Sequence, residues 1–314
     1  MRFLAMLAWF AVRCAAADFH EFHTTVTPLP DENIRQPCCY DLTLPASVPA
    51  VRAVFVIFDR GQDWVKFYHD PEVRRFAESH RLALLYPWHC PSKERDDMIV
   101  EPRAGVGRAL LRSLEQFAQE TGRADLRSAG LVVIGWSGAG SLTARLSGYA
   151  PDRVLAAIDY APGQYEPLGM DTIELPPAAL RVPQLIIANG ADKVNGTARP
   201  YGFFRRYWDQ GAPWTFALQN RTPHCCLQNA QPLILAWLDS VLAGRKAGSR
   251  GFLTLEESDV RDTWNLPVSN AVSARIGQAP KPHEVLAGVL PGAAFAREWL
   301  TFVRRHDPPK IWHP

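Results

Sequence analysis

A serine, an aspartate and a histidine, Ser137, Asp192 and His224, each follow a short hydrophobic segment of this 314-residue chain. A histidine can remove the proton from a serine hydroxyl, and a carboxylate can orient that histidine and stabilise its cation. The three residues are 55 and 32 positions apart, so only folding can bring them together. Their types and order predict nucleophilic attack on a carbonyl group through an acyl-enzyme intermediate.

The segment around Ser137 carries the strongest signal. The hydrophobic run at 131–134 predicts a buried strand, and Ser137 stands where the next helix begins. A serine at such a tight turn is held in a strained backbone conformation, with its hydroxyl clear of the sheet. Because strand and helix approach closely there, the flanking positions must be small, and Gly135 and Ala139 meet that requirement. The backbone N–H of Gly138 can donate to a developing oxyanion.

This pentapeptide, Gly-Trp-Ser-Gly-Ala, resembles the nucleophile elbow Gly-x-Ser-x-Gly of the α/β-hydrolase family, with Ala139 in place of the last glycine. The spacing of the three residues is similar to that in the dienelactone-hydrolase and prolyl-oligopeptidase branches. The resemblance covers about residues 40–243. It implies that the serine, the acid and the histidine follow in that order, each on a loop at the carboxyl edge of the sheet. The segment 162–183 is too short to form a large cap over the site.

Two aspartates compete for the role of the acid. Asp192 follows the hydrophobic segment QLIIANG, and Asp159 ends the segment RVLAAID. In the family the acid more often follows the later strand, so the resemblance favours Asp192. The alternative use of Asp159 is to cap the end of its strand. The base that follows the acid is then His224.

The same resemblance implies where the rest of the oxyanion hole lies. A second oxyanion donor should come from the loop after residues 52–58, where Arg60 or Gly61 stands and the family often has His-Gly. Gly61 can equally serve the turn itself. Four aromatic residues can line an acyl or alcohol pocket, with core packing as the alternative for each. They are Trp64, Trp88, Trp136 and Tyr160.

Hydrophobic runs alternate with helical patterns along most of the chain. The pattern predicts strands at 40–44, 52–58, 82–86, 131–134, 154–158, 185–188 and 214–218, and helices at 71–80, 107–121, 137–148, 231–242 and 295–304. Residues 18–37 are polar and contain prolines, residues 245–292 are expected to be irregular, and Pro87 is expected to end its strand. The alternation predicts an α/β fold, with a mostly parallel central sheet covered by helices on both faces.

The first 17 residues are typical of an export signal. Arg2 precedes an apolar run at 3–12, and three alanines precede a predicted cleavage after Ala17. The alternative is an ordinary N-terminal helix. Cleavage would remove Arg2 and Arg13 and lower the formal net charge from +2 to 0. Residues 18–314 are predicted to form one domain, with a core at about 40–243 and an extension at 245–314 packed on it.

Five cysteines would remain after cleavage, and in an exported protein they are disulfide candidates. They are Cys38, Cys39, Cys90, Cys225 and Cys226. Family topology places the strand at 40–44 antiparallel beside the strand at 82–86, which implies that Cys90 pairs with Cys38 or Cys39. The other cysteine of that pair would reach Cys225 or Cys226. The alternatives are buried thiols or a metal site completed by His224, but adjacent cysteines are poor ligands for one ion, so no metal is expected.

No lysine- or arginine-rich run indicates a nucleic-acid partner, and no phosphate-binding glycine loop indicates a cofactor. The apolar run at 3–12 is too short to span a membrane. The predicted function is a secreted or periplasmic serine hydrolase that cleaves a small-molecule or polymeric carboxylic ester. The alternatives are a peptidase or amidase with the same three residues, or an inactive binding protein of the same fold. The sequence does not determine the oligomeric state.

Overall fold

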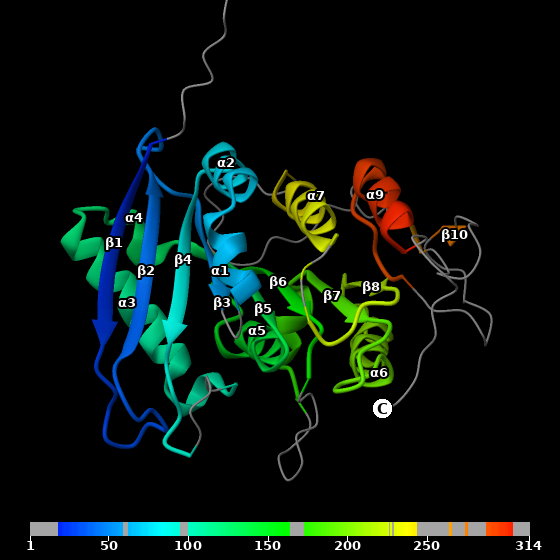
Figure 1. Cartoon of the computed structure of the whole chain (residues 1–314), viewed down its shortest axis with the longest axis horizontal. Helices are drawn as coiled ribbons and strands as arrows, with labels where there is room; N and C mark the ends of the chain where they lie inside the picture. Colours follow the sequence, from blue (N-terminus) through cyan, green and yellow to red (C-terminus); the bar gives the residue numbers. More distant parts are fainter. Residues whose placement is uncertain are drawn as a thin grey trace, which may run out of the picture.

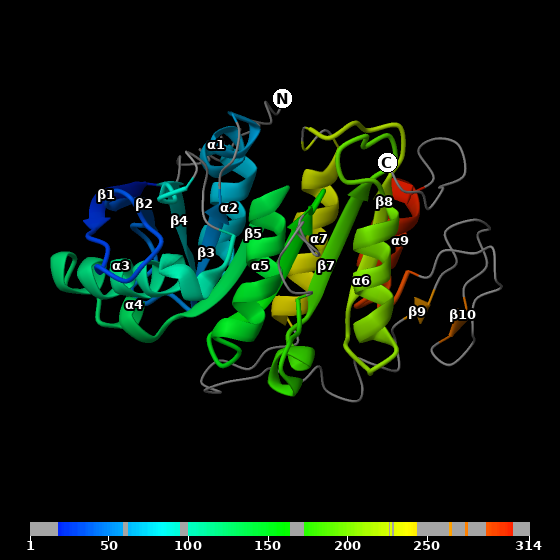
Figure 2. The same cartoon turned by 90° about the horizontal axis from the view of Figure 1, so that it is seen from below.

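The computed structural model describes residues 18–58, 62–94, 100–163, 173–225, 227, 229–243, 264–265, 274–275 and 287–303. Its centre is an eight-stranded sheet in the order β1-β2-β4-β3-β5-β6-β7-β8 (Figures 1 and 2). The strands of this sheet are β1 (Phe19–Val26), β2 (Cys38–Pro45), β3 (Ala53–Phe58), β4 (Leu82–His89), β5 (Gly130–Trp136), β6 (Val154–Tyr160), β7 (Gln184–Asn189) and β8 (Thr215–Gln219). A separate two-stranded sheet consists of β9 (Trp264–Asn265) and β10 (Ala274–Arg275).

The six strands from β4 to β8 in this order are parallel, and β1 and β2 are antiparallel to their neighbours. Helices pack on both faces of the sheet. They are α1 (Gln62–His69), α2 (Pro71–Ser79), α3 (Val106–Glu120), α4 (Asp125–Ser128), α5 (Gly138–Tyr149), α6 (Ala198–Trp208), α7 (Ala230–Ala243) and α9 (Ala293–Val303). The predicted α/β fold class is therefore confirmed.

The central strands have hydrophobic residues on both sides, because each face of the sheet lies under helices. In β3, Phe55 and Ile57 belong to one hydrophobic cluster, while Val54 and Val56 belong to the other. All six residues of this strand are buried. A continuous apolar run in the sequence thus corresponds to a strand between two separate cores.

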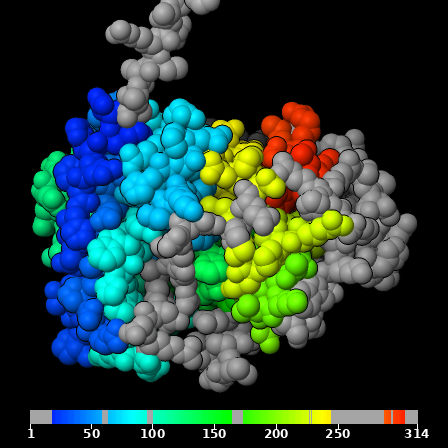
Figure 3. All heavy atoms as spheres, in the orientation of Figure 1, coloured from blue at the N-terminus to red at the C-terminus, as the bar shows by residue number. Residues whose placement is uncertain are grey.

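Helices α2, α7 and α9 lie side by side on one face, where Figure 3 shows the cyan, yellow and red surfaces in contact. The amide of Gln231 on α7 donates to carboxylate oxygens of Asp70 and Glu72 at the start of α2, at 3.1 and 3.0 Å. Asp70 also caps α2, because its side chain accepts from the backbone N–H groups of Glu72 and Val73. These contacts join segments that are far apart in the sequence.

Two strands differ from the prediction. No strand was predicted in residues 18–37, but β1 lies there and pairs with β2 along its whole length at the edge of the sheet. Its sequence is polar because an edge strand with one solvated side needs few apolar residues. β4 continues through Pro87 to His89. β3 pairs with β4 only as far as Leu85, so the missing N–H of Pro87 lies where the strand has a single neighbour.

Three helices, α1, α4 and α6, were not predicted from the sequence. α6 contains Pro200 and Gly202, which weaken its helical pattern. Pro200 is tolerated because it stands in the first turn, where backbone N–H groups have no intrahelical acceptor. The apolar side of α6 packs on β8, with Tyr201 and Phe204 against Phe216.

A disulfide joins Cys38 at the start of β2 to Cys90 directly after β4, with the two Cα atoms 4.2 Å apart. This is one of the two pairings implied by the family topology. The further prediction, that Cys39 reaches the loop of His224, was wrong, because Cys39 is a free thiol. In the pairing of β2 with β4, Cys39 lies opposite His89. Cys225 is also disulfide-bonded.

The segment 287–303 covers the outer edge of β8. The backbone N–H of Phe216 donates to Ala287, and that of Val289 donates to Trp214, at 2.7 and 2.8 Å. Gly288 has a φ of 83°, and a Cβ there would lie 2.1 Å from the Trp214 carbonyl oxygen. Trp299 of α9 also donates its indole N–H to the Phe216 carbonyl at 2.9 Å. The free edge of β8 therefore finds hydrogen-bond partners in this segment.

Candidate active site

Ser137 stands between β5 and α5 with a φ of 56° and a ψ of −123°. This backbone conformation is strained for a residue with a side chain. A Cβ on Gly135 would lie 2.4 Å from the carbonyl oxygen of Ala139. The position two residues before the serine thus requires glycine, and the close approach also explains why Ala139 is small. The local sequence forces the sharp turn that exposes the serine hydroxyl.

Gly138 is the first residue of α5. The first N–H groups of a helix have no carbonyl acceptor within the helix, and they carry the positive end of its dipole. The backbone N–H of Gly138 is therefore positioned beside the serine to donate a hydrogen bond to an anion. The candidates for the second donor, Arg60 and Gly61, lie outside the described residues.

Asp192 lies in the turn after β7 and is fully buried. Its Oδ1 accepts hydrogen bonds from the backbone N–H groups of Val194 and Asn195, at 2.8 and 2.9 Å. Its Oδ2 lies 2.6 Å from Nδ1 of His224. A buried carboxylate needs such partners, since each compensates for lost hydration. The turn fixes one oxygen and directs the other toward the histidine.

His224 lies in the loop after β8 and joins Asp192 to Ser137. Its Nε2 is 2.9 Å from the Oγ of Ser137. An ionised carboxylate can only accept a hydrogen bond, so in the neutral ring the proton is on Nδ1, facing Asp192. Nε2 then has the free lone pair and can accept the serine proton. The histidine side chain is 14% exposed and that of Asp192 is 1% exposed, so solvent reaches the histidine and hardly reaches the acid.

These three residues follow three different parallel strands, β5, β7 and β8. Parallel strands have their carboxyl ends at one edge of the sheet, which is where ligands bind in open α/β sheets. Folding thus brings together residues that span 87 positions of the chain. The positions of Ser137, Asp192 and His224 after separate hydrophobic segments of the sequence agree with their place at this edge.

Asp159, the alternative acid, lies at the end of β6 and is fully buried. Its Oδ1 accepts a hydrogen bond from Thr143 Oγ1 on α5 at 2.6 Å. His224 has its carboxylate contact with Asp192 instead. Of the two aspartates, Asp192 therefore has the geometry of an orienting acid.

The four predicted pocket aromatics have different surroundings. Trp64 and Tyr160 pack edge to face in the core, with 2% and 0% exposure, so neither lines an open pocket. For these two residues the alternative of core packing is confirmed, because the hydrophobic cluster on their face of the sheet encloses them. Trp88 is 46% exposed and donates to Asp41 on β2 at 3.3 Å. Trp136 is the one that contacts the site, since its ring lies against His224 with centroids 5.1 Å apart.

Two asparagines near the site carried no signal in the sequence. The side-chain amide of Asn195 donates to the carbonyl of Ala161 at 3.0 Å, and it lies 3.4 Å from Nδ1 of His224. Asn189 donates to carbonyls on both sides of His224. Single amides in a loop have many structural uses, so only the folded arrangement distinguishes these two.

Two of the cysteines considered as metal ligands, Cys38 and Cys225, are disulfide-bonded. Among the residues that the structure describes, no three histidines, cysteines or acids come close enough to hold a metal ion. In the same part of the chain, no helix has the length and apolar character needed to cross a bilayer.

The strand order, the directions of the strands and the turn that carries Ser137 define the α/β-hydrolase fold. No protein-family model matches the chain, and no curated protein sequence matches it. Solved structures do share the fold. An esterase from Rhizomucor miehei is 14% identical, with a TM-score of 0.50 over 73% of this chain and 86% of that chain. A ferulic acid esterase is 13% identical, with a TM-score of 0.50 over 69% of this chain and 97% of that chain.

A third structure with this fold is a protein from Bacteroides ovatus assigned as a dipeptidyl aminopeptidase IV. It is 12% identical, with a TM-score of 0.52 over 74% of this chain. The match covers only 37% of that protein. At these identities the likeness shows a common fold, and it leaves the substrate open.

Proposed function

We propose that this chain is a serine hydrolase that cleaves carboxylic esters. The observation that supports this most is the hydrogen-bonded series from Asp192 Oδ2 through His224 to Ser137 Oγ, at 2.6 and 2.9 Å. In this proposal Ser137 is the nucleophile, His224 the general base and Asp192 the acid that orients the base. The esterases among the structural neighbours agree with this assignment through their fold alone.

The proposed reaction has two halves. Nε2 of His224 takes the hydroxyl proton as Oγ of Ser137 attacks the carbonyl carbon of the ester. The oxygen of the tetrahedral intermediate becomes negative and accepts a hydrogen bond from the Gly138 N–H. The carbon–oxygen bond of the ester breaks, and the alcohol leaves with the proton held by His224. A water molecule then gives a proton to His224 and attacks the carbonyl carbon of the acyl-serine. The bond from this carbon to Oγ breaks, the carboxylic acid leaves, and His224 returns the proton to Ser137 Oγ.

A peptidase or amidase would use the same residues, and an inactive binding protein would keep the same fold. The leaving group of an ester is an alcohol. That of an amide is an amine, whose nitrogen must be protonated before the carbon–nitrogen bond breaks. Matched p-nitrophenyl ester and p-nitroanilide substrates with the same acyl group separate the first two functions. Activity on neither substrate, together with no covalent labelling of Ser137, would favour the binding protein.

Covalent labelling with a fluorophosphonate tests the nucleophile directly. We expect the label on the peptide that contains Ser137, and we expect Ser137→Ala to lose both labelling and ester hydrolysis by at least about 10³-fold. Ser141→Ala is the matched control, because this serine lies in α5, the helix that begins directly after Ser137, and is fully buried. The control should keep its activity. A Ser137→Ala protein with a tenth of the wild-type kcat would contradict the assignment.

We also propose that the protein acts in an oxidising compartment outside the cytoplasm. The Cys38–Cys90 disulfide supports this, because such bonds persist mainly in exported proteins. The signal-like segment at 1–17 supports it from the sequence. Expression with this segment, followed by N-terminal sequencing of the exported protein, should give Asp18 as the first residue. Retention of the intact segment in the cytoplasm would contradict the proposal.

A further inference from the structure

Asn189, the last residue of β7, makes contacts on both sides of the proposed base. Its side-chain Nδ2 donates to the carbonyl oxygens of Pro223 and Cys225, at 2.8 and 3.2 Å. These two residues directly precede and follow His224. Asn189 itself is fully buried. A single amide group, with its two N–H donors, thus holds the backbone that carries the histidine.

The backbone of Asn189 also contacts the acid turn. Its carbonyl oxygen accepts the N–H of Asp192 at 3.2 Å. A neighbouring bond joins the same two loops, since the N–H of Ala191 donates to the carbonyl of Thr222 at 2.9 Å. The end of β7 therefore fixes the acid through its backbone and the base through a side chain.

We propose that Asn189 is a positioning residue for the hydrolytic reaction, acting through His224. This inference rests on the proposed function. The side-chain amide bonds to the backbone on either side of His224, so its effect on the reaction passes through the histidine loop. Rigid support of this kind determines whether a catalytic group is in its productive geometry, and a displacement of about 1 Å can lower a rate about 100-fold.

The surroundings of the two carbonyls separate a positioning role from a folding role. Pro223 is exposed and Cys225 is partly exposed. If the amide is removed, water can reach these carbonyls and replace its hydrogen bonds. The loop can then still fold, but it loses the fixed donor that determines the place of His224. We therefore expect removal of the amide to affect the reaction rate more than the stability.

The chain offers a matched control at the other end of the same strand. Gln184, the first residue of β7, is also fully buried and donates its amide to Ser147 Oγ at 3.0 Å. In both residues the amide oxygen has no hydrogen-bond partner in the described part of the chain. Gln184→Ala thus removes a comparable buried amide at the edge of the sheet away from the site.

The first test compares Asn189→Ala, Asn189→Asp and Gln184→Ala on a p-nitrophenyl ester, with Tm measured for each. Asp has the size of Asn, but its ionised carboxylate cannot donate to a carbonyl. We expect both Asn189 variants to lower kcat about 10- to 100-fold with KM changed less than about threefold. Gln184→Ala should lower Tm and keep kcat. If the Asn189 variants lose no more kcat than Gln184→Ala, the inference is wrong.

The second test asks whether Asn189 acts through His224. The rate of fluorophosphonate labelling at Ser137 is measured for Asn189→Ala, for His224→Ala and for the double variant. A residue that acts only through His224 has no further effect once that side chain is gone, so the double variant should label at the His224→Ala rate. If Asn189→Ala lowers the labelling rate of the His224→Ala protein by the same factor as it lowers that of the wild type, Asn189 has a general structural role and the inference is overturned.

The outcomes also separate this inference from the proposed function. If Ser137→Ala and His224→Ala keep their activity, the proposed function fails, and the role of Asn189 fails with it. If both variants are inactive but Asn189→Ala behaves like Gln184→Ala, only the positioning role is rejected. Should Asn189→Asp not fold, Asn189→Ala decides the comparison, because it introduces no buried charge.

Discussion

The indole ring of Trp136 lies against the imidazole ring of His224, with centroids 5.1 Å apart and planes inclined by 35°. Trp136 directly precedes Ser137, so one short segment supplies both the nucleophile and a support for the base. The histidine becomes a cation during the proposed reaction, and the face of an aromatic ring attracts a cation. The contact should therefore stabilise the charged histidine.

This geometry gives a prediction for Trp136. Trp136→Leu should lower kcat about fivefold or more, because a cation–aromatic contact contributes about 1 kcal/mol and a cavity adds to the loss. Trp136→Phe keeps an aromatic face and should lose less. The measurement is kcat for both variants on one ester. Equal losses in the two variants would indicate a role in packing alone.

The second prediction concerns the two aspartates. Asp192→Asn should lower kcat by up to about 10⁴-fold, because an amide can present a donor to the histidine and favour the wrong tautomer. Asp159→Asn should keep most of the activity, since an amide oxygen can still accept from Thr143. The measurement is kcat/KM for each variant on the same ester. The reverse order of losses would assign the acid to Asp159.

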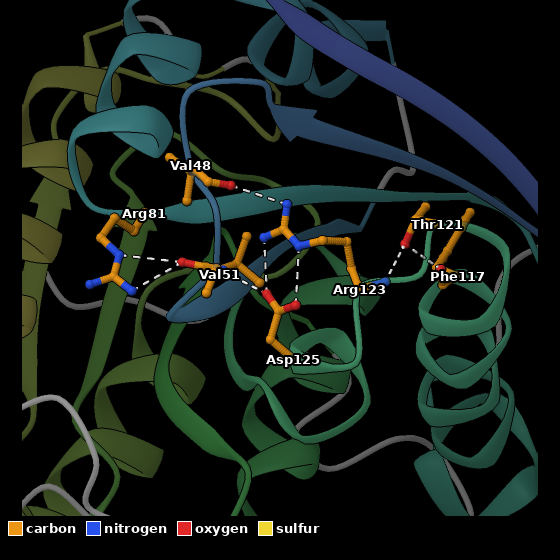
Figure 4. Close-up of polar contacts among 8 residues, drawn as sticks. Val48, Val51, Arg81, Phe117, Thr121, Arg123 and Asp125 are labelled. Atoms are coloured by element: carbon orange, nitrogen blue, oxygen red, sulfur yellow. Dashed lines mark hydrogen bonds and ion pairs between the residues drawn. The ribbon is translucent and has the colours of Figure 1, made fainter.

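The third prediction uses an ion pair at the other edge of the sheet. Asp125 accepts from Arg123 Nε and Nη2 at 3.1 and 3.0 Å and from the Val51 N–H at 2.7 Å (Figure 4). Arg123 also donates to the carbonyl of Val48 at 3.1 Å. Burial alone would raise the pKa of Asp125, but the hydrogen bonds from Arg123 and Val51 outweigh it and lower the pKa below its ordinary value.

A carboxyl group with a lowered pKa in the folded state stabilises the protein above its unfolded pKa of about 3.9 and loses that effect as the pH falls below it. Asp125→Asn should therefore lower the free energy of unfolding at pH 7 by on the order of 1 kcal/mol, and Tm should fall with it. The difference from the wild type should shrink between about pH 5 and pH 2. Thermal unfolding across this range is the measurement, with exposed Asp152→Asn as control. If the Tm difference between Asp125→Asn and the wild type is the same at every pH, the lowered pKa of Asp125 is contradicted. The kcat of Asp125→Asn should equal that of the wild type.

The fourth prediction concerns the disulfide. Cys38 and Cys90 are 52 positions apart, and a bond that closes a loop of this size stabilises a protein by about 2–4 kcal/mol. The double variant Cys38→Ser/Cys90→Ser should lose that amount in denaturant unfolding. Alkylation without reduction should modify Cys39, which is a free thiol. Finding Cys39 in a disulfide would contradict the pairing.

The serine turn could be predicted from the sequence because it depends on neighbouring residues. A buried strand, a glycine and a small residue around Ser137 determine the tight turn locally, and a Cβ on Gly135 would meet the helix backbone. The α/β fold class could be predicted for a similar reason. Strands buried between two layers, such as β3, give continuous apolar runs. β1 and α6 were missed because an edge strand and a helix with Pro200 have weaker patterns.

Other features depend on contacts between distant segments, and only the tertiary structure decided them. Asp159 and Asp192 both follow hydrophobic segments, and the positions of β6, β7 and β8 in the sheet determine which one meets His224. The roles of Trp64 and Tyr160 in the core depend on the helices that cover them. Asn189 is one amide among several in the sequence. Its two hydrogen bonds around His224 exist only because β7 ends beside the loop after β8.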